Sequence, residues 1–362
     1  MTTRPRFTAL IDTYNHERFL AEAIESVLAQ DFPLSEMEIL VVDDGSTDST
    51  PQVAARYSDR VRYIRKENGG QASALNLGFA EAHGEFIAML DGDDVWLPQK
   101  LRRISEIFEQ HAEAGMVVHP YQYWFPEEGR AVDDLSFVPL SGFLPDSEDA
   151  ILRFGGVGTC STALRTEVAR RLLPLPESLK VFADSYLLPV AIFSTPLVGI
   201  KEHLTRYRHH GSNLAARGAA DPAGLRRSNA SFRSAIEETR RWFQSNGFFA
   251  RGRAAALLVE RMELVEQLQQ FALSAPGRRE FFGHLRRYHR LYAPLWSPAY
   301  RFFDNVKAGA GFILGYQGFY AAQRSYRRQA SLPRLRESLV PAARRDLAAS
   351  SASGPTESWE MR

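Results

Sequence analysis

Short apolar runs alternate with amphipathic segments over the first hundred residues, and no other feature restricts the fold as strongly. The apolar runs predict strands at 7–11, 38–42, 61–64 and 85–90. The amphipathic segments predict helices at 17–30, from about 48, and at 71–82. Strands that alternate with helices in this way form βαβ units around a parallel sheet. The predicted fold class is therefore α/β.

The pattern is looser after residue 115. Strands are expected at 117–118 and 197–207, helices at 165–173 and 184–193, and irregular structure over 125–147. Beyond about Asn213 the chain has a helical, arginine-rich pattern without a strand signal. From Ser350 onward the composition predicts a disordered tail.

Polar clusters follow three of the predicted strands, at 12–15, 43–48 and 91–94. In open α/β sheets, ligands bind outside the carboxyl ends of the strands. A carboxylate-rich site would repel phosphates unless a cation lay between them, and oxygen ligands favour Mg²⁺ or Mn²⁺. The three clusters together therefore predict a metal-bridged nucleotide diphosphate.

Each cluster alone has a simpler interpretation. Residues 44–48, Asp-Gly-Ser-Thr-Asp, could be a turn that caps the next helix, and residues 91–94, Asp-Gly-Asp-Asp, could be a solvated acidic loop. A calcium loop is excluded because the remaining ligand spacing and the terminal Glu are missing. The chain also lacks a Gly-x-Gly-x-x-Gly motif after the first strand, a P-loop, and the basic glycine-rich loop of a sugar-nucleotide pyrophosphorylase.

These clusters carry a family resemblance. The segments at 11–15, 26–30, 38–48, 68–70 and 84–94, with Asn76 and Gly78, resemble the family 2 glycosyltransferases. The resemblance covers residues 7–120 and continues more weakly to about residue 213. It implies a GT-A type fold, in which helices flank a Rossmann-like mixed sheet, with a helical C-terminal extension here.

The resemblance also implies a nucleotide-sugar site. Tyr14 would pack on the nucleobase, Asp44 would accept a hydrogen bond from the imide edge of uracil or thymine, and Asp91 would hold the ribose. Asp93 would bind the metal that bridges the diphosphate. The whole implied set is Asp12, Thr13, Tyr14, Asn15, Asp44, Asn68, Gly70, Gln71, Asp91, Gly92 and Asp93.

Two further roles come from the weaker part of the resemblance. Asp184 matches the family's catalytic base, and His210, in the segment Tyr-Arg-His-His-Gly-Ser-Asn, would face the diphosphate or the metal. A helix N-cap remains the alternative for Asp184, and an ordinary surface or core histidine the alternative for His210. The chain departs from the family at Asp12, where Pro is usual, and at Ala183, where an acid is usual.

The function implied is inverting transfer of a sugar from a nucleotide diphosphosugar, a UDP- or dTDP-sugar, to a hydroxyl acceptor, with Mn²⁺ or Mg²⁺ as cofactor. The acceptor would be a sugar, a glycan or a lipid-linked acceptor in cell-surface polysaccharide or glycolipid synthesis. The alternative is a non-catalytic nucleotide-sugar-binding or assembly partner with the same fold. Ala183 is the feature that favours it.

Charge divides the chain and suggests three regions. Residues 1–213, the predicted catalytic domain, hold 20 Lys and Arg against 31 Asp and Glu, whereas residues 214–346 hold 23 against 10. Residues 347–362 form the predicted tail. The basic region is either a helical bundle packed on the catalytic domain or a surface for an anionic membrane. It has no nucleic-acid-binding module, so no nucleic acid partner is expected.

Two observations bear on the compartment. The N-terminus enters an apolar strand without the long apolar segment of a signal peptide, and Cys160 is the single cysteine, which suits a reducing environment. The predicted location is cytoplasmic, with peripheral attachment to the inner face of the membrane as the further expectation.

Overall fold

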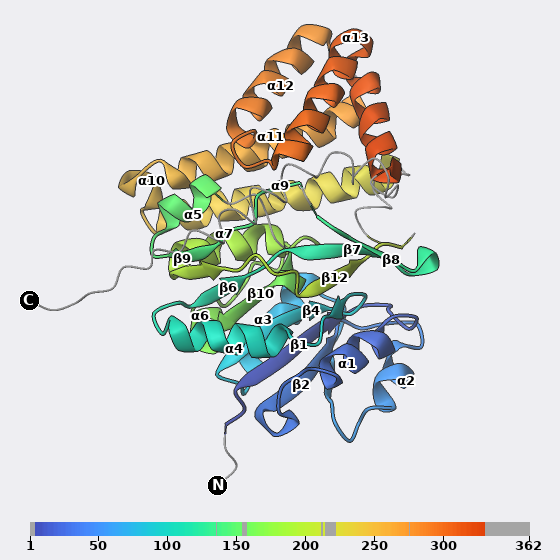
Figure 1. Ribbon diagram of the computed structural model, residues 1–362, viewed down its shortest axis with the longest axis vertical. Coiled ribbons are helices and arrows are strands. Elements are labelled where there is room, and N and C mark those ends of the chain that lie inside the picture. Colours follow the sequence, from blue (N-terminus) through green and yellow to red (C-terminus); the bar gives the residue numbers. More distant parts are fainter. Residues whose placement is uncertain are drawn as a thin grey trace, which may run out of the picture.

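A computed structural model describes residues 4–329, apart from residues 135, 154–157, 211–212, 214–221 and 275. Two sheets with flanking helices form one part of the molecule, and long helices form the other end (Figure 1). The predicted tail at 347–362 lies outside the described residues.

The larger sheet has eight strands in the order β3-β2-β1-β4-β10-β6-β11-β9. Its strands are β1 (Phe7–Thr13), β2 (Met37–Asp43), β3 (Arg62–Arg65), β4 (Phe86–Asp91), β6 (Met116–Val118), β9 (Gly142–Leu144), β10 (Thr162–Arg165) and β11 (Leu197–Gly199). The first four are mutually parallel, whereas β10 is antiparallel to both β4 and β6. The predicted α/β class is confirmed, and the sheet is mixed.

A second sheet has the order β5-β12-β7-β8. Its strands are β5 (Val95–Trp96), β7 (Tyr121–Phe125), β8 (Arg130–Asp133) and β12 (Thr205–Arg208). The single strand predicted at 197–207 is wrong, because β11 and β12 belong to different sheets and the exposed Lys201 and Glu202 lie between them. The irregular structure predicted at 125–147 is also wrong, since β8 and β9 lie there.

Helices connect the strands and then follow them. They are α1 (Leu20–Leu28), α2 (Thr50–Ala55), α3 (Gln71–Glu81), α4 (Lys100–Gln110), α5 (Ser147–Arg153), α6 (Thr166–Arg171), α7 (Asp184–Ser194), α9 (Pro222–Ser245), α10 (Phe248–Arg251), α11 (Ala254–Ser274), α12 (Arg278–Tyr292) and α13 (Pro298–Gln329). Short 3-10 turns lie at η1 (Leu34–Glu36), η2 (Pro126–Glu128) and η3 (Thr159–Ser161). None of the helices in the described ranges has both the length and the hydrophobicity needed to cross a membrane.

The strand β1 lies at the centre of the core. All seven of its residues are buried, as in a parallel strand covered on both faces. Its side chains alternate between the faces, so Phe7 and Ile11 pack with α1 and α4 while Leu10 packs with α3. The period of two thus fixes which helices cover each face.

The helices after residue 213 belong to two different cores. Phe243 of α9 and Leu258 of α11 are buried in the same cluster as Leu10 of β1 and Leu187 of α7. A separate small cluster joins the end of α11 to α12 and α13, through Phe271, Phe281, Leu285 and Phe319. Figure 1 shows α12 and α13 at the end of the molecule opposite α1 and α2. The boundary predicted at residue 213 stays a prediction.

Candidate active site

The carboxyl ends of β1, β2 and β4 meet at one edge of the larger sheet. The register pairs Asp12 of β1 with Asp91 of β4, and Thr13 with Asp43 of β2. Because parallel strands end at the same edge, the three polar clusters predicted from the sequence come together there.

Two of the acids at the end of β4 and directly after it have fixed partners in the protein. The carboxylate of Asp91 accepts hydrogen bonds from Oγ1 of Thr159 at 2.8 and 2.9 Å, and Oδ1 of Asp94 accepts one from the backbone N–H of Arg208 at 2.9 Å. Burial raises the pKa of both carboxyl groups, and neighbouring acids raise it further. The other oxygen of Asp94 is buried and has no hydrogen-bond partner among the described residues.

These two acids also lie beside a thiol. The ligand atoms of Asp91, Asp94 and Cys160 lie within 4.8 Å of one another, a spacing that could hold a metal ion. Burial raises the pKa of the Cys160 thiol, and a protonated thiol does not suit the hard ions Mg²⁺ and Mn²⁺. The carboxylates are therefore the members of this group that fit such an ion.

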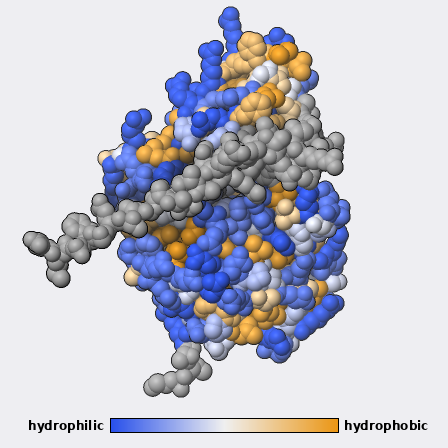
Figure 2. Space-filling model, viewed as in Figure 1, coloured by the Kyte–Doolittle hydropathy of each residue, from blue (hydrophilic) through white to orange (hydrophobic). Residues whose placement is uncertain are grey.

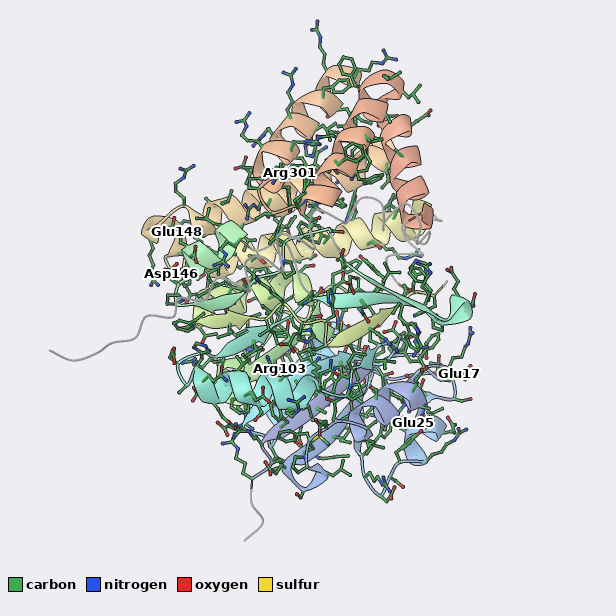
Figure 3. All side chains as sticks on the ribbon, viewed as in Figure 1. Glu17, Glu25, Arg103, Asp146, Glu148 and Arg301 are labelled. Atoms are coloured by element: carbon green, nitrogen blue, oxygen red, sulfur yellow. The ribbon has the colours of Figure 1, made fainter. Side chains whose placement is uncertain are left out.

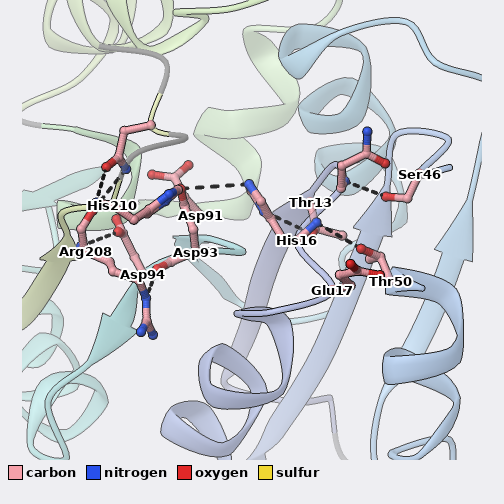
Figure 4. A network of polar contacts seen from close by, with 12 residues as sticks. Thr13, His16, Glu17, Ser46, Thr50, Asp91, Asp93, Asp94, Arg208 and His210 are labelled. Carbon is pink, nitrogen blue, oxygen red and sulfur yellow. Dashed lines mark hydrogen bonds and ion pairs between the residues drawn. The ribbon is translucent and has the colours of Figure 1, made fainter. Parts of the chain in front are cut away.

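Asp93 faces two histidines that come from distant parts of the chain (Figure 4). Nε2 of His210 lies 3.0 Å from Oδ2 of Asp93, and Nε2 of His16 lies 3.8 Å from the same oxygen. Burial acts to raise the pKa of Asp93, but the hydrogen bond from His210 and the charges of the two histidines outweigh it, and the pKa is lowered. The carboxylate is thus held ionised, as a metal ligand must be.

The predictions included His210 but missed His16. Its side chain is anchored by a contact of 3.2 Å between its Nδ1 and Oγ1 of Thr13. Its sequence signal is its position directly after the polar cluster at 12–15.

A buried arginine at the end of β12 fixes the segment that carries His210. Arg208 donates from Nε to the backbone oxygen of Asp93 at 2.7 Å and from its guanidinium to Glu22 at 2.7 Å. Asn213 donates to the backbone oxygen of Arg208 at 3.0 Å, and its own oxygen accepts the backbone N–H of His210 at 2.6 Å. These bonds set the position from which His210 reaches Asp93.

Asp12 is a buried carboxyl group inside this acidic site. Burial, followed by the charges of Asp93 and Asp184, raises its pKa to about 7, although a hydrogen bond with Gln71 opposes the shift. Its Oδ1 atom is buried and has no hydrogen-bond partner among the described residues. The effect of Asp184 on Asp12 joins the predicted base electrostatically to the acids at the strand ends.

Asp184 is the first residue of α7. The N-cap residue is Ala183, whose backbone N–H donates to the side-chain oxygen of Gln71 at 3.0 Å. Oδ1 of Asp184 accepts the backbone N–H of Ser185 at 2.8 Å, and burial raises the pKa of this carboxyl group. Asp184 is therefore not the N-cap that the alternative interpretation required.

Asp44 organises the loop that precedes α3. Its Oδ1 accepts hydrogen bonds from Nζ of Lys66 and from the backbone N–H of Gly69, both at 2.9 Å, and its Oδ2 accepts the backbone N–H of Gly70 at 2.7 Å. A carboxylate has about four acceptor positions. The three donors thus leave one acceptor position of Asp44 for a further hydrogen bond.

The same loop brings other predicted residues into position. Asn68 donates to the backbone oxygen of Asp44 at 2.9 Å. Gly70 has φ +89°, and a Cβ there would lie 2.4 Å from the Cα of Lys180, so this position requires glycine. The backbone N–H of Gln71 donates to the carbonyl of Lys180 at 2.9 Å. The loop and the segment before Asp184 are therefore tied together.

The cluster after β1 contains residues that hold the structure and one exposed aromatic residue. Asn15 accepts the backbone N–H of Thr47 at 2.8 Å, and a Cβ on Gly92 would lie 2.6 Å from Oγ1 of Thr13. Tyr14 is 44% exposed. Of the residues at 13–15, Tyr14 is the one whose side chain forms no hydrogen bond within the described part of the chain.

Three comparisons with known proteins bear on this site. Residues 8–168 match the sequence profile of the family described as Glycosyl transferase family 2. An uncharacterized glycosyltransferase of Nostoc sp. is 35% identical over 217 residues, which are 58% of this chain and 66% of that protein. The poly(ribitol-phosphate) beta-N-acetylglucosaminyltransferase TarS of Staphylococcus aureus is 33% identical over 110 residues, which are 29% of this chain and 19% of that protein.

The matched segments thus span less than two thirds of the length of these curated relatives. Among solved structures, that of S. aureus TarS residues 1–349 has a TM-score of 0.51 at 17% identity and covers 89% of this chain and 91% of that chain. The complex of the same TarS fragment with UDP-GlcNAc has a TM-score of 0.50 at 18% identity, with coverage of 89% and 92%. At such identities the likeness shows the fold alone.

Proposed function

Because residues 8–168 belong to glycosyltransferase family 2 and the chain has the GT-A fold, we propose that this protein is an inverting glycosyltransferase. It would move a sugar from a nucleotide diphosphosugar to a hydroxyl group of an acceptor. One observation carries the proposal: the side chain of Gln71 accepts the backbone N–H of Ala183 at 3.0 Å and is also hydrogen-bonded to Asp12, the register partner of Asp91. Asp184, the proposed base, and Asp93, the proposed metal ligand, would therefore belong to one site.

The donor we propose is a UDP- or dTDP-sugar. The carboxylate of Asp44 can only accept hydrogen bonds, and the imide N–H of uracil or thymine is a donor. One acceptor position of Asp44 remains after its three bonds to Lys66, Gly69 and Gly70. The likeness to a TarS fragment that binds UDP-GlcNAc supports the same donor class.

The acidic residues fit a divalent cation, Mn²⁺ or Mg²⁺. Asp12, Asp91 and Asp93 lie together, and the charge of Asp93 raises the pKa of both Asp12 and Asp91, so together they would repel a diphosphate. Asp93 and His210 would hold the ion, which, when bound, supplies positive charge for the departing diphosphate. Tyr14 would stack on the nucleobase, and Asp91 would hold the ribose.

Asp184 would accept the proton of the acceptor hydroxyl. The freed oxygen attacks the anomeric carbon from the side opposite the diphosphate, and the bond from that carbon to the diphosphate oxygen breaks with its electron pair on the diphosphate. Direct displacement inverts the anomeric centre. Burial raises the pKa of Asp184 above that of a free aspartate, which strengthens it as a base.

The acceptor we propose is a sugar, a glycan or a lipid-linked acceptor in cell-surface polysaccharide or glycolipid synthesis, used in the cytoplasm at the inner face of the membrane. The name of TarS, which acts on poly(ribitol-phosphate), supports a polymeric acceptor.

A panel of UDP-, dTDP- and GDP-sugars with Mn²⁺ or Mg²⁺ tests the proposal. Thermal shift reports binding, and release of the nucleoside diphosphate reports turnover. We expect both with a uracil or thymine donor. Binding without turnover in the presence of acceptors would favour a non-catalytic nucleotide-sugar binder, the alternative suggested by Ala183.

A further inference from the structure

Large apolar side chains are exposed on α13. Phe302, Phe312, Ile313 and Leu314 each expose 60% or more of their surface, and Val306 exposes 50%. Phe302, Val306 and Ile313 recur at helical spacing and so lie along one stripe. We call these five residues the α13 face. Figure 2 shows hydrophobic surface gathered at this end of the molecule. Exposed contiguous apolar surface of this kind marks an interaction site.

The end of this face protrudes. Residues 312–314 are consecutive, so their side chains spread over about 200° of the helix circumference, and all three are exposed. The helix is interrupted immediately afterwards at Gly315, which has φ 69° and ψ −164°. A single flat partner helix could not cover three such directions. A fluid surface that surrounds the tip, such as a lipid layer, could cover all three directions.

Positive charge borders the α13 face. The ring of Phe282 on α12 lies 5.0 Å from that of Phe312, and Arg278 and Arg286 lie one helical turn before and after Phe282. Both arginines are exposed and form no ion pair within the described part of the chain. Long nitrogen-tipped side chains project from this end (Figure 3).

Few acids oppose these cations. Residues 278–329 contain ten Lys and Arg but only Glu280 and Asp304 as acids. Asp304 is buried and paired with Lys307 at 2.5 Å, so it does not offset the exposed arginines. The surroundings of the apolar tip are therefore cationic.

We propose that α12 and α13 dock this protein on an anionic lipid surface. The α13 face would enter the boundary between headgroups and acyl chains, and Arg278 and Arg286 would contact the headgroups. A short amphipathic surface with flanking basic residues binds membranes in this way. The inference goes beyond the proposed sugar transfer and does not depend on it.

Flotation of the full-length protein with vesicles tests this docking. Phosphatidylcholine vesicles with and without 30% phosphatidylglycerol would be compared at low and high salt. We expect flotation with the anionic vesicles at low salt and little flotation at high salt, because salt screens the attraction. Arg278→Ala/Arg286→Ala should lower the vesicle affinity about 30-fold, since each basic residue near an anionic surface contributes about fivefold.

Ile313→Ser/Leu314→Ser should abolish the part of the binding that survives high salt. Matched controls are Arg56→Ala/Arg60→Ala and Leu34→Ser, which remove exposed residues of the same types from the sheet-containing part. UDP-dependent thermal shifts in every variant separate this inference from the proposed function. Absence of flotation, or equal flotation of wild type and both α12–α13 variants, would overturn the proposal. The proposal would also be overturned if the wild type formed dimers without binding vesicles and the Ile313→Ser/Leu314→Ser variant were monomeric. The α13 face would then bind a second copy of the chain.

Discussion

Nε2 of His210 lies 3.0 Å from Oδ2 of Asp93, although 117 positions separate the two residues in the sequence. Asp93 follows β4 of the larger sheet, and His210 follows β12 of the second sheet. Their contact therefore joins the two sheets at the candidate active site. It also determines which of the three acids at 91–94 meets the histidines.

We expect Asp93→Ala to remove cation-dependent nucleotide binding. In wild type, UDP with Mn²⁺ at 100 times the dissociation constant should stabilise the fold by about 2.7 kcal/mol, and the variant should lose this gain because it lacks the proposed metal ligand. Thermal unfolding with and without EDTA measures this stabilisation. Asp59→Ala, which removes an exposed acid, is the control. Equal UDP stabilisation in wild type and Asp93→Ala would contradict the assignment.

Asp44→Asn should weaken UDP binding by roughly tenfold to a hundredfold, because a hydrogen bond to a charged acceptor is lost. Asp44 also holds the loop before α3, so a second variant must separate the two roles. Lys66→Met removes one loop contact and keeps the acceptor. It should weaken UDP binding less and leave the preference for UDP over GDP unchanged. Calorimetric titration with both nucleotides measures this, and tighter binding of GDP by wild type would refute the role of Asp44.

Asp184→Asn should lower turnover by about 10² to 10⁴ while donor affinity stays nearly unchanged, because the amide keeps the size of the side chain but cannot accept the proton. Steady-state kinetics with donor and acceptor give turnover, and thermal shift gives donor affinity. The exposed Glu177 provides a matched control as Glu177→Gln. A normal rate in Asp184→Asn would place the base elsewhere.

Asp12 should make stability fall with rising pH in the absence of cation and nucleotide. Its pKa is raised in the folded state from 3.8 to about 7, so the folded protein binds the extra proton between these values. The contribution is fully present below pH 4 and is lost as the pH rises through 7. Asp12→Asn removes the titrating group, so its melting temperature should decline less steeply between pH 5 and 8. Asp31→Asn, at an exposed acid, should retain the wild-type slope, and parallel curves for all three proteins would exclude this role of Asp12.

The first four strands could be predicted to within two residues because β1, β2 and β4 are nearly continuous apolar runs that end in a polar cluster, and β3 follows from the alternation of strands and helices. Strands such as β8 and β9 could not, because they have four and three residues and their pairing partners set their conformation more than their own sequence does. In the site, Asp93 and His210 followed from the family resemblance. Arg208 lies in the resembling segment without a predicted role, and His16 and Thr159 were not predicted, because the roles of all three depend on which elements approach in the folded chain.

The burial of Phe243 and Leu258 with Leu10 of β1 has a consequence for protein engineering. A cut at residue 213 would remove part of the hydrophobic core that covers the sheet. It would also leave α9 and α11 with an uncovered apolar side. A joint in a chimeric enzyme is better placed near Gly277, the residue before α12. Fusion there separates the cluster of Phe271, Phe281, Leu285 and Phe319, and also the backbone hydrogen bonds that join residues 295–297 to residues 136–138. The last two helices could then be exchanged for those of a related protein while the sheet-containing part keeps its hydrophobic interior.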